Sequence, residues 1–293
     1  MVIIQLMGGL GNQMYAYALY SAFMAGPQKA MLHETGNIGF DTWNERIKWG
    51  SRLTCFPAIQ AEMATARDLK RVCDIRTGPV QGLMNRFGIR LGTPRIFTET
   101  AYGEYDPSLF EMDNTYLQGY WQNPGYFKDI TADLKRDFVF FTSEKAEDMQ
   151  AEDRIRNTNS VSVHIRRGDY LKFPEIYGGI CTEAYYQKAL EIIQARVEEP
   201  CFFFFTDDPE WVRSQFKMEN MTVVDWNASS QESWRDMRLM HLCKHNIIAN
   251  SSFSWWAAWL NDNPNRLVLS PALWESGKPL AADRRIQDWI YLE

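Results

Sequence analysis

Short apolar runs alternate with segments of helical spacing throughout the second half of the chain. The apolar runs are rich in Val, Ile and Phe, which is typical of buried strands, and a segment long enough for a helix follows most of them. A helix between two strands returns the chain to the same edge of the sheet, so such strands pair in parallel. The expected strands are residues 161–165, 201–205, 221–226, 246–250 and 266–270, and the expected helices are residues 182–199, 207–216, 233–244 and 252–262.

Three of these helices have recognisable N-terminal signals. Thr182 is a suitable cap for the first, and Asp208 is a cap followed by Pro209 in the first turn of the second. Ser229 and Glu232 have the spacing of a capping box ahead of the third helix.

The first half begins with the same pattern and then loses it. Residues 2–6 (VIIQL) are expected to form a buried strand, followed by a glycine turn and a helix over 12–25. Further strands are expected at 29–33 and 115–121, with a helix near 126–137, and residues 34–92 are expected to form short helices and loops.

The length of 293 residues suits two domains of about 150 residues each. Residues 142–159 are strongly charged and contain no Gly or Pro, as in a solvated helix or connector. We therefore expect an α/β protein with a domain of residues 1–155 and a domain of residues 156–293. The last residues are candidates to pack back on the first domain.

Composition excludes several classes of protein. The net charge of −6 gives no basic field for a nucleic-acid backbone, so no nucleic-acid partner is expected. The five cysteines are scattered, with no Cys-x-x-Cys spacing, which is typical of reduced thiols in a cytosol. Apolar runs fall short of the ~20 residues that cross a bilayer. We expect a cytoplasmic protein, and peripheral contact with the membrane stays open.

Two adjacent arginines, Arg166 and Arg167, follow the expected strand 161–165. In a doubly wound sheet, ligands bind beyond the carboxyl ends of the strands, where these arginines fall. Side chains alternate along a strand, so Arg166 shares a face with His164, and Arg167 points the other way or into the loop. A guanidinium donates two parallel hydrogen bonds to phosphate oxygens. Surface pairing with acids such as Asp169 is the alternative, but the position at a strand end favours an anion site.

Two acids follow the next strand at the equivalent position. Capping accounts for Asp208, which leaves Asp207 for a partner with paired N–H donors, such as the edge of a guanine. A metal site is the competing hypothesis, and it lacks further ligands nearby.

The segment Asn250–Trp256 (NSSFSWW) lies between another strand and its helix. The N–H groups and the dipole of a helix N-terminus attract phosphate, and Ser252 and Ser254 add hydroxyl donors. Simple capping by one of these serines is compatible with the same role.

The glycine turn near the N-terminus matches half of a dinucleotide-binding fingerprint. Gly9 and Gly11 have the right spacing, but Met14 occupies the third glycine position, which argues against a nicotinamide cofactor. Asn12 and Gln13 at the helix start are candidates to hold a diphosphate or a sugar.

His241 and His245 have the i, i+4 spacing of a zinc helix, but no third ligand stands out. We interpret them as ordinary residues of a helix end and expect no metal site. Most of the 11 tryptophans are expected in the core, although some could stack on sugars.

Taken together, the motifs resemble those of the bacterial α-1,2-fucosyltransferases of glycosyltransferase family 11. The segments that carry the resemblance are GGLGNQMYAYALYSAF (8–23), YLQGYWQNPGYF (116–127), SVHIRRGDY (162–170), FFFFTDDPEW (202–211) and NIIANSSFSWWAAWLN (246–261).

The resemblance implies a GT-B-like fold of two Rossmann-type domains facing a central cleft. It also implies GDP-fucose as the donor, held mainly by the second domain, a galactoside acceptor, inversion at the anomeric carbon, and no cofactor or metal. The roles that it implies for single residues are the β-phosphate for Arg166 or Arg167, the guanine for His164 and Asp207, and the diphosphate for Ser252, Phe253 and Ser254. The acceptor would be an oligosaccharide or a lipid-linked glycan, as in O-antigen biosynthesis.

The general base cannot be assigned from spacing. Asp169 could accept the acceptor's proton or orient a guanidinium, and the second role is slightly favoured. A Rossmann oxidoreductase accounts only for the glycine turn, and a noncatalytic glycan-binding module accounts only for the tryptophans. A transferase that uses a GDP-sugar accounts for every motif.

Overall fold

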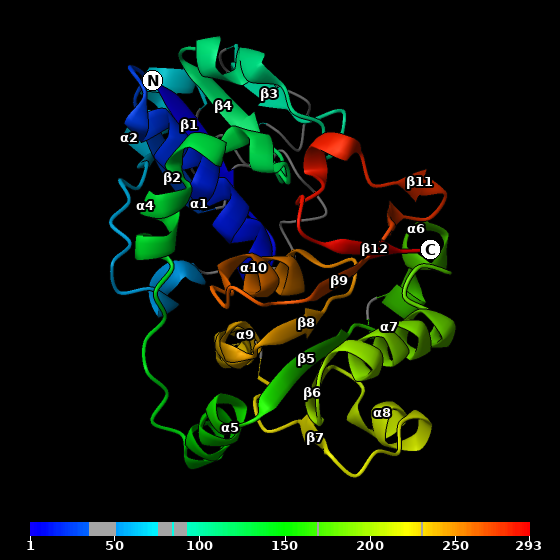
Figure 1. The fold of residues 1–293 in the computed structure, drawn as a ribbon. Coiled ribbons are helices and arrows are strands. Elements are labelled where there is room, and N and C mark those ends of the chain that lie inside the picture. Colours follow the sequence, from blue (N-terminus) through cyan, green and yellow to red (C-terminus); the bar gives the residue numbers. More distant parts are fainter. Residues whose placement is uncertain (35–50, 76–83, 85–92, 169, 230) are drawn as a thin grey trace. The chain divides into compact units, whose positions relative to one another are not determined.

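The computed structural model describes residues 1–34, 51–75, 84, 93–168, 170–229 and 231–293. These residues form two compact units, Met1–Val139 and Phe140–Glu293 (Figure 1). Each unit contains a parallel sheet with helices, so the predicted α/β class with two Rossmann-type domains is confirmed.

The first unit is built on a parallel sheet whose described strands have the order β2-β1-β4-β3. β1 is mostly apolar and is buried along its whole length, including Gln5, because β2 and β4 flank it on both sides and helices cover it. The described elements of this unit are β1 (Val2–Leu6), α1 (Leu10–Ala25), β2 (Ala30–Glu34), α2 (Ala66–Cys73), β3 (Ile96–Thr98), β4 (Thr115–Gln118) and α4 (Thr131–Asp137), with 3-10 turns at Leu53–Cys55, Pro107–Glu111, Pro124–Tyr126 and Lys128–Ile130.

Sequence patterns located most of these elements. The strand β3 was not expected, because its three residues are too few to show a period. Of the segment 34–92, for which short helices and loops were expected, residues 35–50, 76–83 and 85–92 lie outside the described part of the chain. The described remainder does contain the short helix α2, which Thr65 and Asp68 cap reciprocally.

The second unit contains a larger parallel sheet, whose described strands have the order β12-β9-β8-β5-β6-β7. Its elements are α5 (Ala146–Asn157), β5 (Asn159–Ile165), α6 (Pro174–Tyr177), α7 (Glu183–Arg196), β6 (Pro200–Thr206), α8 (Pro209–Gln215), β7 (Met221–Val224), α9 (Ser233–Leu242), β8 (His245–Ile247), α10 (Ser252–Leu260), β9 (Val268–Pro271), β10 (Leu273–Glu275), β11 (Lys278–Pro279) and β12 (Ile290–Leu292), with 3-10 turns at Tyr170–Lys172 and Ala282–Arg284.

This strand order places a topological switch point between β5 and β8. The chain builds β5, β6 and β7 toward one side of the sheet and then returns to add β8, β9 and β12 on the other side. Loops that leave β5 and β8 therefore run to opposite sides at the carboxyl edge of the sheet, and such switch points are where open α/β sheets bind their ligands.

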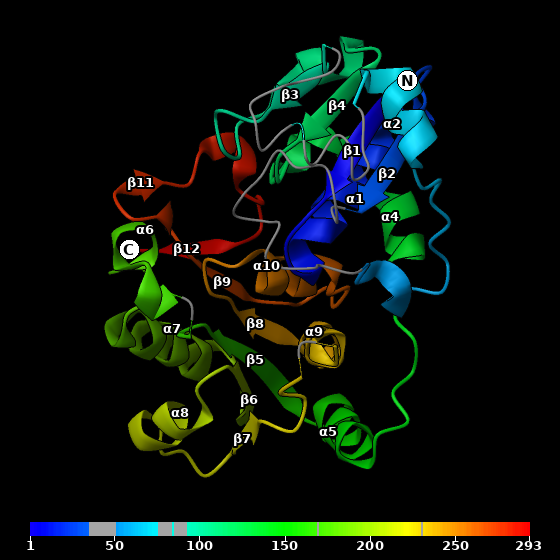
Figure 2. The ribbon, with the colours of Figure 1, turned by 180° about the vertical axis from the view of Figure 1, so that it is seen from behind.

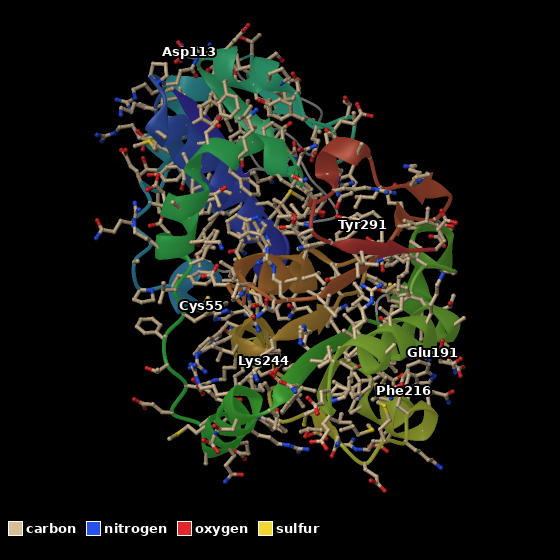
Figure 3. All side chains as sticks on the ribbon, viewed as in Figure 1. Cys55, Asp113, Glu191, Phe216, Lys244 and Tyr291 are labelled. Carbon is tan, nitrogen blue, oxygen red and sulfur yellow. The ribbon has the colours of Figure 1, made fainter. Side chains whose placement is uncertain are left out.

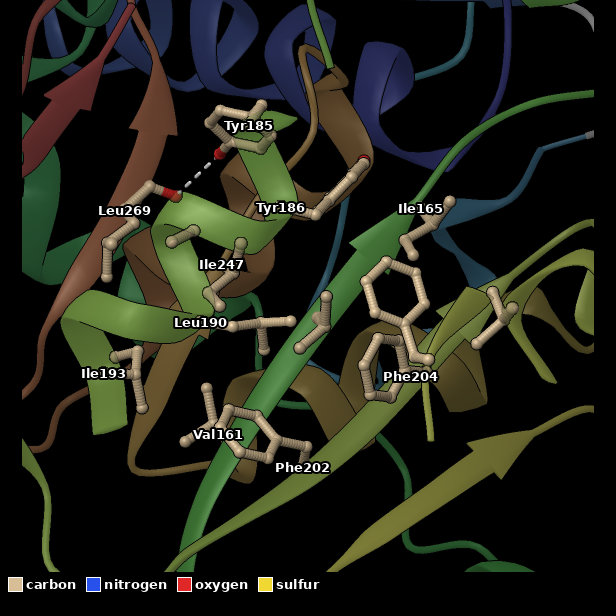
Figure 4. Close-up of a cluster of buried hydrophobic side chains, with 14 of the residues drawn as sticks. Val161, Ile165, Tyr185, Tyr186, Leu190, Ile193, Phe202, Phe204, Ile247 and Leu269 are labelled. Carbon is tan, nitrogen blue, oxygen red and sulfur yellow. Dashed lines mark hydrogen bonds between the residues drawn. The ribbon is translucent and has the colours of Figure 1, made fainter. Parts of the chain in front are cut away.

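The two faces of this sheet are covered by different helices, α7 and α8 on one and α5, α9 and α10 on the other, which Figure 2 shows from behind. Val161, Val163 and Ile165 point into the core on the α7 side, as their alternation predicts. Figure 4 shows Val161 and Ile165 of β5 beside Phe202 and Phe204 of β6, under the buried face of α7. His164 and Ser162 consequently face the α9 and α10 side.

Phe216, labelled in Figure 3, lies in the same core just after α8, with its ring centroid 5.1 Å from that of Phe204. Burial of large aromatic side chains contributes most of the stabilisation of such a core, at about 25 cal/mol per Å² of apolar surface removed from water. A rigid core directly under β5 and β6 fixes the carboxyl ends of these strands.

The division between the units lies earlier than the predicted one at residue 155. The predicted boundary falls inside α5, and α5 packs on α9 and β5 of the second unit. The buried Asp148 of α5 fixes this packing, because its carboxylate accepts hydrogen bonds from Trp226 Nε1 and Asn227 Nδ2, both at 2.8 Å. The charged segment is thus the first helix of the second unit. The C-terminal residues form β12, the edge strand of the second unit's sheet.

Candidate functional site

The carboxyl end of β5 continues directly into the two arginines. We call Arg166, Arg167 and Gly168 the arginine loop. Asp207, which follows β6, holds this loop: its Oδ1 accepts a hydrogen bond from the Arg167 N–H at 2.8 Å, and its Oδ2 accepts one from the Gly168 N–H at 3.1 Å. The same Oδ2 lies 3.1 Å from Arg166 Nη1. Both carboxylate oxygens of Asp207, for which the sequence predicts a contact with guanine, therefore contact the loop.

The two arginines have different surroundings. Arg167 Nε donates to Asp208 Oδ2 at 3.0 Å, and its guanidinium lies over the Trp211 ring, 4.0 Å from the centroid. This cation–π contact and the ion pair tie the loop to α8. Arg166 follows the last residue of β5, and its guanidinium pairs with Asp207. The structure therefore gives the two arginines different partners, Asp208 and Trp211 for Arg167 and Asp207 for Arg166.

Asp208 caps α8 as predicted, because its Oδ1 accepts from the Trp211 N–H at 3.2 Å. The sequence offered no signal for its second contact, with Arg167, or for the aromatic ring beneath that arginine. The predicted capping box of Ser229 and Glu232 is wrong: α9 begins at Ser233, without a side-chain cap. Ser229 instead closes a turn in which its carbonyl accepts from the Glu232 N–H.

Residues 250–254, which span the end of the turn after β8 and the first residues of α10, form the opposite side of the switch point, and we call them the serine turn. His164, with 6% of its surface exposed, lies with Nδ1 2.8 Å from the hydroxyl oxygen of Ser254, which is fully buried. The ring centroids of His164 and Phe253 are 5.7 Å apart. The end of β5 and the start of α10 are therefore joined by contacts between predicted site residues.

Capping of α10 falls to a serine that the sequence did not single out. Ser251 is the N-cap, and its Oγ accepts from the Phe253 N–H at 3.3 Å. Ser252 is the first residue of the helix and Ser254 lies in its first turn, so the proposed phosphate-binding hydroxyl of Ser252 is not the cap. The cap was expected at Ser252 or Ser254, and the structure places it at Ser251.

Asn250 shapes the serine turn from inside. Its side-chain Nδ2 donates to the Trp274 carbonyl at 3.1 Å, and its Oδ1 accepts from Cys181 Sγ at 3.4 Å. Its carbonyl accepts from the Tyr170 hydroxyl at 2.8 Å, which links the turn to the segment after the arginine loop. Asn250 is nearly fully buried, so these contacts hold the backbone of the turn. Tyr170 and Cys181 carry no local signal for this role.

The buried Tyr186 supports the backbone of His164. Tyr186 of α7 donates its hydroxyl proton to the His164 carbonyl at 2.9 Å. Burial raises the pKa of Tyr186 well above its usual value, so the hydroxyl remains a donor at any physiological pH. The strand end that carries the histidine is therefore held on both faces of the sheet.

The predicted glycine site lies in the first unit, between β1 and α1. Gly8 has a φ of +75°, which favours glycine, and Gly9 precedes the first residue of α1 in extended conformation. Gln13 is buried, its Nε2 donates to the Gly8 carbonyl at 3.1 Å, and its Oε1 accepts from the Arg52 N–H at 2.8 Å. The amide of Gln13 therefore stabilises the glycine turn itself. Gly11 is buried inside the first turn of α1.

Asn12 contacts a second element of the first unit. Its Oδ1 accepts from Gln122 Nε2 at 2.8 Å, which joins the start of α1 to the segment after β4. Since β1 and β4 are neighbours in the sheet, this pair lies at the switch point of the smaller sheet. Gln122 belongs to the segment YLQGYWQNPGYF, but only the strand order shows that it adjoins Asn12.

The structure gives His241 and His245 structural roles. The His241 ring stacks on Phe140, with centroids 5.5 Å apart, and burial lowers its pKa to about 4. His245 Nδ1 accepts from the Leu267 N–H at 3.0 Å. Within the described residues, no cluster of three or more His, Cys, Asp or Glu side chains could hold a metal ion. Asp169, the candidate base, lies outside the described residues.

These observations define an α/β protein with two arginines, a histidine and a helix N-terminus at the switch point of its larger sheet. The model of glycosyl transferase family 11 matches residues 105–293. The O-antigen biosynthesis glycosyltransferase WbnK of Escherichia coli is 32% identical, over 98% of this chain and 99% of that protein. The chain belongs to glycosyl transferase family 11, so the motif resemblance is confirmed and the chain is a glycosyltransferase.

Two further relatives differ in how much of the chain they match. An alpha-1,2-colitosyltransferase of Escherichia coli is 29% identical over 100% of this chain and 99% of its own length. The human galactoside alpha-(1,2)-fucosyltransferase 1 is 28% identical over 49% of this chain and 42% of its own length.

Among solved structures, NodZ alpha-1,6-fucosyltransferase soaked with GDP-fucose matches 88% of this chain and 92% of its own, with 14% identity and a TM-score of 0.41. The ADP-heptose heptosyltransferase II of Escherichia coli matches 99% of this chain and 89% of its own, with 11% identity and a TM-score of 0.46. In the described residues, no helix is both long and apolar enough to span a membrane.

Proposed function

We propose that this glycosyltransferase transfers L-fucose from GDP-fucose to the 2-hydroxyl of a terminal galactose, in an oligosaccharide or a lipid-linked glycan. The observation that carries the proposal is the contact between His164, at the end of β5 just before the arginine loop, and Ser254 of the serine turn, at the switch point of the larger sheet. A permanent positive charge and the N-terminus of α10 at one edge suit a diphosphate. The names of the relatives support an α-1,2 linkage.

Arg166 is the better candidate for the β-phosphate. Arg167 pairs with Asp208 and lies over Trp211, whereas Arg166 pairs with Asp207 and has the more exposed side chain, 39% against 26%. We assign the α10 N-terminus, with Ser252, Phe253 and Ser254, to the diphosphate, and His164 to the guanine. Gly9 and Asn12 of the first unit remain proposed donor contacts.

Inversion follows if the acceptor hydroxyl attacks from the side opposite the departing GDP. The sugar then develops positive charge while the leaving diphosphate gathers negative charge. Arg166 and the N–H groups of α10 stabilise this negative charge more strongly in the transition state than in the ground state, and so lower the barrier. Asp169 keeps both of its proposed roles, as the base for the acceptor hydroxyl or as a partner of a guanidinium.

Transfer of colitose is a second candidate. The relative named as a colitosyltransferase matches the whole chain, whereas the human fucosyltransferase matches about half of it. Colitose lacks the 3-hydroxyl of fucose, so a donor site that binds this hydroxyl prefers fucose and one that does not bind it accepts both.

Mass spectrometry of lactose and other galactosides, incubated with enzyme and either GDP-fucose or GDP-colitose, tests both candidates. The mass increase identifies the sugar, and NMR of the product identifies the linkage and the anomeric configuration. A product with fucose α-linked to O2 of galactose supports the proposal. Exclusive transfer of colitose, or linkage to another hydroxyl, refutes it.

We further propose that the reaction needs neither cofactor nor metal ion, that the protein binds no nucleic acid, and that it works in the cytoplasm. A lipid-linked acceptor would bring it to the inner face of the cytoplasmic membrane as a peripheral protein. Full activity in a chelator tests the first point, and co-sedimentation with vesicles that carry the acceptor lipid tests the last.

A further inference from the structure

The carboxylate of Asp207 holds the backbone and the side chain of the arginine loop at once. It accepts from two consecutive N–H groups and from the Arg166 guanidinium, so three contacts define the path of the chain just after β5. Hydrogen bonds to a charged acceptor are about twice as strong as those between neutral groups. The arrangement comes from two neighbouring parallel strands, because β5 and β6 pair in register up to Ile165 and Thr206.

Gly168 is needed for the same contacts between Asp207 and the arginine loop. A Cβ atom at this position would lie 2.9 Å from Asp207 Oδ2, closer than real Cβ contacts. Any larger residue would therefore push the carboxylate away from the loop. The glycine after the two arginines thus permits the close approach of this carboxylate.

Asp207 is also only partly shielded, with 25% of its side chain exposed. Its oxygens nevertheless have partners from the arginine loop, so recognition of guanine would require it to give up or share these contacts. Arg166, in contrast, keeps a more exposed side chain at the switch point. Asp207 thus contacts the loop backbone and Arg166 together, and Arg166 is the more exposed of the two side chains.

We propose that Asp207 is a positioning residue: it orients Arg166 toward the β-phosphate of the donor and does not recognise the guanine. This inference rests on the proposed function, because it takes a GDP-sugar as the ligand. A guanidinium held in place before the reaction needs no reorganisation when charge develops on the leaving group. Asp207 then acts on the diphosphate only through Arg166 and the loop.

The test compares Asp207→Asn with the wild-type enzyme in calorimetric titrations of GDP, GMP and IDP. Asn has nearly the same size and keeps one acceptor, but it loses the ion pair with Arg166. GMP lacks the β-phosphate, and IDP lacks the 2-amino group of guanine. We expect the affinity for GDP to fall about 10-fold or more, the affinity for GMP to fall much less, and the preference for GDP over IDP to stay unchanged.

Gly168→Ala is the second variant, because it leaves Asp207 chemically intact and displaces it sterically. We expect the same selective loss of GDP affinity. Both substitutions act through one contact, so the fold-loss of GDP affinity in the double variant should be smaller than the product of the two single losses. Asp225→Asn is the matched control: this carboxylate lies at the end of the next strand, β7, and pairs with Arg213. It should bind all three nucleotides as the wild type does.

Three outcomes overturn the inference. Equal loss of GDP and GMP affinity, with the preference for GDP over IDP abolished, would show that Asp207 contacts the guanine. Unchanged GDP affinity in both folded variants would show that the contacts with the loop have no role in binding. A wild-type enzyme that binds no GDP would instead refute the proposed donor, and the positioning role with it. Thermal unfolding of each variant establishes that it is folded.

Discussion

His164 and Ser254 are 90 residues apart in the sequence, yet the imidazole Nδ1 lies 2.8 Å from the serine hydroxyl oxygen. Both residues are buried, one at the end of β5 and the other in the first turn of α10. This pair fixes the two sides of the switch point relative to each other.

Ser254→Ala should destabilise the second unit and weaken the donor site together. Removal of the hydroxyl leaves the buried imidazole without this partner, which costs about 1–3 kcal/mol in the free energy of unfolding. Denaturant unfolding measures the loss, and KM for the donor should rise. Ser252→Ala provides the comparison, because Ser252 is only partly buried, and its loss of stability should be smaller. Equal losses in the two variants would contradict the importance of the pair.

Arg166→Ala and Arg167→Ala should fail in different ways. Arg166→Ala should keep its stability and lose about 100-fold or more in kcat, because one charge that stabilises the leaving group is gone. Arg167→Ala should lose stability, since it removes the contacts with Asp208 and Trp211 that tie the loop to α8. Steady-state kinetics and denaturant unfolding of both variants separate the two effects. If Arg167→Ala instead loses kcat and Arg166→Ala loses stability, the phosphate contact lies at Arg167.

Gly8→Ala should destabilise the first unit, while Gly9→Ala should not. Gly8 has a φ of +75°, and an added Cβ would lie 2.5 Å from Asn12 Nδ2. The left-handed conformation alone costs a non-glycine residue about 1–2 kcal/mol. At Gly9, no atom lies within 4 Å of an added Cβ. Unfolding midpoints of the two variants provide the measurement, and a stable Gly8→Ala variant would show that the turn can relax.

Stability between pH 5 and pH 8 should report on Asp236. Burial raises the pKa of Asp236 to about 7, and the nearby Asp148 carboxylate adds to this increase. Because the folded state holds the proton more tightly than the unfolded state, Asp236 contributes a stability that is greatest near pH 4 and is lost as the pH rises toward 7. Asp236→Asn should therefore gain stability relative to the wild type from pH 5 to pH 8. A constant difference between the two proteins would refute the raised pKa.

The alternation of apolar runs with helical segments was sufficient to predict the parallel α/β class and most strands of the second unit. It worked because a strand buried on both faces needs a continuous apolar sequence, which is a local property. It failed for β3 and β12, whose three residues are too short to show a period, and for the unit boundary, because the charged helix α5 is held by Asp148, a residue buried only in the tertiary structure.

The sequence by itself determined which residue types stand near strand ends: two arginines after β5, two acids after β6 and serines at the start of α10. Only the tertiary structure decided their partners, with Asp207 on the arginine loop, Arg167 on Trp211 and His164 on Ser254. The physical reason is that strand order and register set which loop ends adjoin, and these depend on contacts between residues that are distant in the sequence, which local patterns do not encode.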